Sequence, residues 1–103
     1  MYQQRRNMRS EIIDAIGDKK IITFTYSGKH RKVEPHCLGE NASGNIILRG
    51  YQIDGGSISR EPEGWKLFKV EGISSLEILD ADFDVRKDYK RNDSAMSKII
   101  SQI

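Results

Sequence analysis

Two lysines stand beside the best core-strand pattern of the chain, in the stretch WKLFKV. Lys66 shares the alternating register of Phe68 and Val70, which predicts one buried face, and Lys69 lies on the opposite face. An ammonium group at the rim of a core strand can bind an anion. Such a lysine can also simply extend from the rim into solvent, and the residues alone leave both alternatives open.

His30, His36 and Cys37 lie close in sequence and could form part of a zinc site. A structural zinc site uses four ligands, and no further acid or thiol follows a recognised spacing, so we predict no bound metal. Cys37, the single cysteine, is expected to be a small buried side chain. Both histidines are expected to be exposed.

Asp80, Asp82 and Asp84 alternate on one strand face. Such a row could bind a divalent cation, but it is more typical of a solvated strand end. The chain has no phosphate-binding glycine loop and no nucleophile elbow. We therefore predict that the protein is not an enzyme and needs no cofactor.

Composition indicates one small globular domain of 103 residues, with 37% apolar and 31% charged residues. No apolar run approaches the roughly 18 residues of a membrane span. We predict no signal peptide, because no apolar region follows the basic residues near the N-terminus. A lone cysteine suits a reducing cytoplasm. Residues 1–32 carry eight Lys/Arg against three acids, and residues 85–103 carry five against two. Both ends could build one basic surface, or be merely solvated.

Apolar residues at a spacing of four predict a helix over residues 8–16, ended by Gly17. Alternating apolar residues predict five strands, at residues 20–26, 30–38, 46–53, 65–70 and 74–80. Pro35 indicates an edge or a bend in the second strand. Short strands joined by tight turns favour a mainly β (α+β) fold, a small, strongly bent five-stranded barrel.

The C-terminal part predicts a separate unit, residues 84–103, after a barrel domain of residues 1–83. Residues 84–91 are polar enough for a mobile linker. Residues 93–103 predict a short amphipathic helix with an apolar stripe of Met96, Ile99, Ile100 and Ile103. This stripe must be buried on the barrel or on another chain, and we predict a homodimer.

The order of these features resembles the WYL domain family over roughly residues 10–83. The helix is followed by ITFTYSG, RKVEPHCL, IILRGY and WKLFKVEGI. An Arg-x-Val-x-Pro-x-x-Leu stretch is matched by Arg31, Val33, Pro35 and Leu38. The pattern of the fourth strand is matched by Lys66, Phe68, Lys69, Val70, Glu71 and Ile73. The resemblance implies an SH3-like or Sm-like barrel.

Two departures weaken the match. The triplet that names the family stands here as Ile46, Ile47 and Leu48, and Gly72 replaces the third arginine of the later motif. The first two arginines of that motif are lysines, which keep the charge but lose the planar fork that grips a phosphate in two places. The departures imply weaker or less selective binding.

The resemblance implies a regulatory, ligand-sensing module of the type found in transcription factors and defence systems. The concave surface of the family is basic and aromatic-edged and implies binding of nucleic acid or nucleotide-like ligands. For this chain we expect single-stranded nucleic acid or a nucleotide. The residues expected to bind such a ligand here are Tyr26, His30, Arg31, Arg49, Lys66 and Lys69. The alternative function is a protein-interaction or dimerisation module. Because residues 1–17 are too short for a helix-turn-helix, we expect a standalone module or a piece of a longer regulator.

Overall fold

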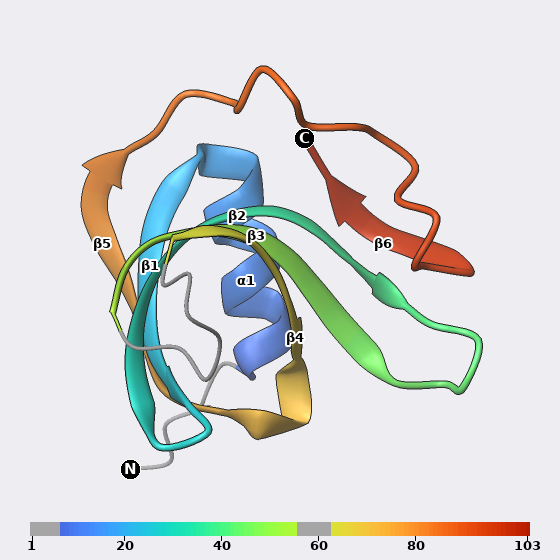
Figure 1. The fold of residues 1–103 in the computed structure, drawn as a ribbon, viewed down its shortest axis with the longest axis horizontal. Coiled ribbons are helices and arrows are strands. Elements are labelled where there is room, and N and C mark those ends of the chain that lie inside the picture. Colours follow the sequence, from blue (N-terminus) through green and yellow to red (C-terminus); the bar gives the residue numbers. More distant parts are fainter. Residues whose placement is uncertain (1–6, 56–62) are drawn as a thin grey trace, which may run out of the picture.

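The computed structural model describes residues 7–55 and 63–103, and within them it forms one helix and six strands (Figure 1). The elements, in chain order, are α1 (Met8–Asp18), β1 (Lys20–Tyr26), β2 (Lys29–Glu40), β3 (Ile46–Gly55), β4 (Gly64–Lys69), the 3-10 turn η1 (Val70–Gly72), β5 (Ile73–Asp82) and β6 (Lys98–Gln102). The five predicted strands are all present. The mainly β class with an N-terminal helix is confirmed.

The strands form one antiparallel sheet in the order β4-β3-β2-β1-β5, and β6 pairs with β2 outside this path. The long strand β2 pairs with β1 through its first half, where Ile22 lies opposite Val33, and with β6 through its last residues. A register shift against β3 lies between Pro35 and Cys37. The predicted bend at Pro35 is therefore real, and it allows β2 to change neighbours along its length.

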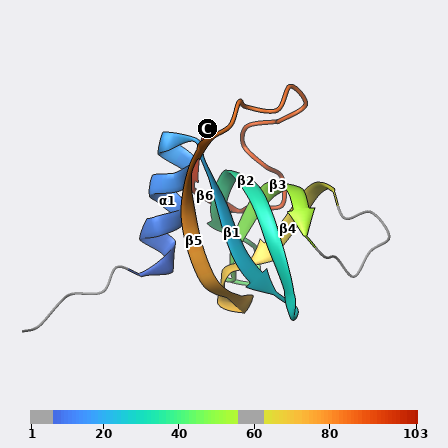
Figure 2. The same ribbon diagram turned by 90° about the vertical axis from the view of Figure 1, so that its left-hand side faces the viewer.

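Helix α1 packs against β1, β2, β5 and β6 and lies to one side of the curved sheet (Figure 2). Its first turn is capped by Asn7, whose side chain accepts a hydrogen bond from the Ser10 amide at 2.8 Å. Gly17 does not end the helix as predicted. The chain turns at Lys19, which adopts a left-handed φ of 53° and donates its amide to the Ile16 carbonyl.

The main core lies between α1 and the concave face of the sheet. Ile12 and Ile16 from α1 meet Phe24 of β1 and Phe68 of β4, all fully or almost fully buried. The rings of Phe24 and Phe68 meet edge to face at 5.0 Å. This placement confirms that Phe68 lies on the inner face of its strand. No helix in the part of the chain that the structure describes is long and apolar enough to cross a membrane.

The predicted C-terminal helix is wrong. Residues 98–102 form β6, which pairs with Cys37–Glu40 of β2, a stretch that β1 leaves unpaired. The open backbone groups of this strand edge accept a sixth strand. Isoleucines every three to four residues fit one face of a helix, but here the pairing of the sheet overrides that pattern.

The apolar stripe of residues 96–103 is packed within its own chain. Ile100 and Ile103 contact the main core, whereas Met96 and Ile99 join a second apolar cluster with Cys37 and Ile47. The stripe is therefore not a surface left open for a second copy. The homodimer that it suggested stays a prediction without this support.

Candidate functional site

Residues 84–97, here called the strap, run along the outer face of β3 and β4. Every second residue of β3 points outward, and residues along the strap contact the outward residues Tyr51, Arg49 and Ile47. The Arg86 guanidinium lies 3.8 Å from the ring centre of Tyr51, Asp93 binds Arg49, and Met96 packs against Ile47. The predicted mobile linker is thus packed on the sheet, where Arg86 and Asp88 have partners on the strands.

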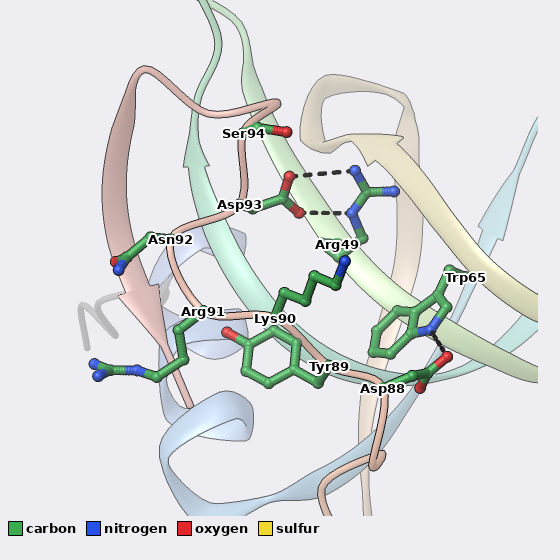
Figure 3. Close-up of a pocket in the computed structure, with 9 residues that line it drawn as sticks. All are labelled: Arg49, Trp65, Asp88, Tyr89, Lys90, Arg91, Asn92, Asp93 and Ser94. Carbon is green, nitrogen blue, oxygen red and sulfur yellow. Dashed lines mark hydrogen bonds and ion pairs between the residues drawn. The ribbon is translucent and has the colours of Figure 1, made fainter.

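The strap and the sheet enclose a pocket of about 400 Å³. Two aromatic rings form part of its wall: Trp65 from β4 and Tyr89 from the strap, with ring centres 6.1 Å apart and planes inclined by 31°. Three basic residues, Arg49, Lys90 and Arg91, complete much of the lining. Figure 3 shows Lys90 extended toward Arg49 and Trp65, whereas Arg91 points away from them.

Two strap carboxylates are engaged inside this pocket. Asp93 accepts hydrogen bonds from Nε and Nη2 of Arg49 at 2.6 and 3.3 Å, and Asp88 accepts one from the Trp65 indole at 2.9 Å (Figure 3). The hydrogen bond from Arg49 lowers the pKa of Asp93, so this carboxylate is ionised near neutral pH. Lys90 and Arg91, by contrast, make no hydrogen bond or ion pair with the described residues.

This arrangement suits an anion that also carries a flat ring. Lysine and arginine attract phosphate groups, and tryptophan and tyrosine faces stack with nucleobases. Tyr89 keeps its proton at neutral pH, because burial raises the pKa of its hydroxyl to about 12. The pocket thus combines neutral aromatic surface with two basic side chains that no described residue pairs with.

The residues predicted to bind the ligand do not form one surface. Tyr26 and Arg31 lie together at one end of the barrel interior, where the guanidinium is 5.6 Å from the Tyr26 ring centre. Arg31 is only 4% exposed and donates to the Tyr26 carbonyl at 3.0 Å and to the Gln52 amide oxygen at 3.2 Å. Its Nε atom is buried and has no hydrogen-bond partner in residues 7–55 and 63–103. Burial lowers the pKa of Arg31, and none of the ion pairs among the described residues includes it.

Lys66 and Lys69 both lie on β4. Lys66 lies opposite Gly50 of β3 and is on the same face of β4 as Phe68. Lys69 is exposed, and its backbone amide donates a hydrogen bond to the Tyr26 hydroxyl at 3.1 Å. His30 is exposed, opposite Thr25. Of the six predicted residues, the structure places only Arg49 in the strap pocket.

His36 was expected to be exposed, and the structure corrects this: the residue is fully buried. Its ring is surrounded by the rings of Trp65, Phe83 and Tyr89, at centre distances of 4.8, 5.1 and 4.9 Å. Nδ1 donates to the Glu34 carbonyl at 2.9 Å and Nε2 accepts from the Arg86 amide at 3.3 Å. Nε2 thus holds the strap through Arg86, whereas Nδ1 bonds within β2, so both ring nitrogens already have hydrogen-bond partners.

Sequence reasoning missed the aromatic and basic residues of the strap. The segment KDYKR, residues 87–91, belongs to the stretch 84–91 that its polar composition predicts to be a mobile linker. A single tyrosine between lysines was the available signal, since aromatic residues interleaved with basic ones are typical of nucleic-acid surfaces. Cys37, in contrast, was predicted correctly as a small buried side chain.

Comparisons with known proteins support the fold. No family model matches the sequence, and no curated protein matches it significantly. Among solved structures, the chain is similar to proteasome accessory factor B/C (PafBC) of Arthrobacter aurescens, with a TM-score of 0.64 and 23% sequence identity. The likeness covers 81% of this chain and only 13% of that one. It supports the WYL-like fold that the sequence motifs predict.

Proposed function

We propose that this chain is a regulatory module that binds an anionic, base-bearing ligand, single-stranded nucleic acid or a nucleotide, in the strap pocket. The observation that carries the proposal is that one pocket is lined by two aromatic rings, Trp65 and Tyr89, and by two cations, Lys90 and Arg91, that have no ion-pair partner among the described residues. The WYL-like fold, a regulatory fold by resemblance, agrees with this assignment. The basic residues Lys66 and Lys69 on β4 offer a second place for a bound strand to continue.

The test uses Trp65, the single tryptophan of the chain, as a reporter. Short single-stranded oligonucleotides should quench its fluorescence, because a base stacked on the indole changes its surroundings. Binding should weaken steeply with salt, and Lys90→Ala should reduce the salt slope by about 0.7, the value of one single-strand phosphate contact. Lys87→Ala, an exposed strap lysine outside this pocket, is the matched control and should bind as the parent does.

Two results would contradict the assignment in different ways. Oligonucleotides and nucleotides that bind neither the parent nor the control would end the proposed function. Binding that is weakened by Lys66→Ala and Lys69→Ala but unchanged by Lys90→Ala would move the site from the strap pocket to the inner end of the barrel.

A further inference from the structure

Asp93 forms an ion pair with Arg49, the cation that β3 contributes to the lining of the strap pocket. The Arg49 guanidinium donates two hydrogen bonds to the Asp93 carboxylate, from Nε at 2.6 Å and from Nη2 at 3.3 Å. A planar fork of this kind fits the oxygens of a phosphate as well as those of a carboxylate. An anion that enters the pocket therefore meets a built-in competitor.

The same aspartate begins the turn that leads to β6. Its side chain accepts the Ala95 amide at 2.9 Å and its carbonyl accepts the Met96 amide at 3.1 Å. Met96 is only 7% exposed and lies over Cys37, whose thiol is 3.3 Å from the Met96 sulfur. A continuous set of contacts thus joins the pocket cation to a buried thiol on β2.

We propose that the Arg49–Asp93 ion pair is a latch, which an anion bound in the strap pocket opens by taking Arg49 from Asp93. Release of Asp93 removes a charge-assisted hydrogen bond from the turn of residues 93–97. That loss loosens the cover of Met96 over Cys37. This inference rests on the proposed function, because it couples ligand binding in the same pocket to a change in the packing of Met96 over Cys37.

Cys37 provides the measurement, because it is the single cysteine and is fully buried. Burial also raises the pKa of its thiol to about 11, so labelling by a thiol reagent is slow while the cover is closed. Asp93→Asn should label about tenfold faster than the parent, the factor in local opening that one charge-assisted hydrogen bond represents. A saturating single-stranded oligonucleotide should accelerate labelling of the parent and have little effect on Asp93→Asn.

Asp84→Asn is the matched control, since it removes the same charge from an exposed strap residue that makes no hydrogen bond or ion pair with the described residues. It should label as slowly as the parent. Arg49→Gln breaks the pair from the other side, so it should label fast and lose its response to the oligonucleotide. All variants are compared far below their melting temperatures, so that global unfolding does not contribute.

Two outcomes would overturn the latch. One is Asp93→Asn and Arg49→Gln labelling as slowly as Asp84→Asn. The other is an oligonucleotide that quenches Trp65 in the parent and leaves the labelling rate of Cys37 unchanged. Failure of the proposed function is distinguished by the fluorescence titration, which would then show no binding at all.

Discussion

A buried histidine ties the strap to the sheet through a single tautomer. His36 donates from Nδ1 to the Glu34 carbonyl and accepts at Nε2 from the Arg86 amide. A proton added at Nε2 would convert this acceptor into a donor, which would then face the amide N–H of Arg86 and lose the hydrogen bond. The Arg86 guanidinium, which is held by the Glu34 carboxylate at 2.8 Å, adds a positive charge nearby. The folded structure therefore requires the neutral form of the His36 ring, which keeps Nε2 as an acceptor.

The charge on His36 should make stability depend on pH. Burial, the largest cause, lowers the pKa of His36 below its ordinary value of 6.5, although Glu34 and Asp88 act in the opposite direction. The unfolded chain then binds the proton more readily than the folded one. The free energy of unfolding should accordingly fall as the pH drops below about 6.5, measured by urea denaturation at several pH values.

The controls for this pH dependence are two histidine variants. His36→Gln should be less stable than the parent and should lose this part of the pH dependence. His30→Gln alters an exposed residue and should keep it. An unchanged pH profile in His36→Gln would show that another group is responsible.

At the scale of elements, β6 docks where β2 carries a glycine. A Cβ atom at Gly39 would stand 2.5 Å from the Lys98 carbonyl oxygen and 2.5 Å from the Met96 sulfur. Backbone cannot move away from such a contact as a side chain can. The close approach of β6 to β2 therefore depends on the absence of a side chain at residue 39.

We expect Gly39→Ala to lower the free energy of unfolding by about 1–3 kcal/mol, as overpacking does. Gly17→Ala is the opposite case, because a Cβ there meets nothing within 4 Å and the residue lies inside α1. It should stabilise the protein by roughly 0.5–1 kcal/mol through helix propensity. Thermal and urea unfolding of both variants measure the difference, and equal stability of Gly39→Ala and the parent would mean that β6 docks less closely.

At the scale of the whole molecule, the C-terminal residues complete the core of the barrel. Ile100 contacts the main core, and β6 fills an edge of the sheet that β1 leaves open. The predicted division into residues 1–83 and 84–103 thus separates parts that share one core. A substitution in β6 should therefore lower the free energy of unfolding without changing the oligomeric state.

Ile100→Ala should lower the free energy of unfolding by about 1–2 kcal/mol, the range for a partly buried aliphatic side chain. Its sedimentation coefficient at micromolar concentration should equal that of the parent, because the side chain packs within its own chain. A change from dimer to monomer with no loss of stability would instead place Ile100 in an interface between two copies.

The sequence by itself determined the local elements. The alternation of Ile22, Phe24 and Tyr26 specified β1, and the register of Phe68 specified which face of β4 is buried. The alternation of residue types is a property of neighbouring residues, so it can be read without knowing the fold. The motifs from residues 10 to 83 carried the resemblance to the WYL-like barrel for the same reason.

Only the tertiary structure decided the fate of residues 84–103 and the composition of the candidate site. Ile99, Ile100 and Ile103 fit a helix stripe as well as a strand, and the unpaired edge of β2 selects the strand. His36 became buried because Trp65 and Tyr89, far from it in sequence, close around it. Such choices depend on long-range partners, and local pattern carries no information about them.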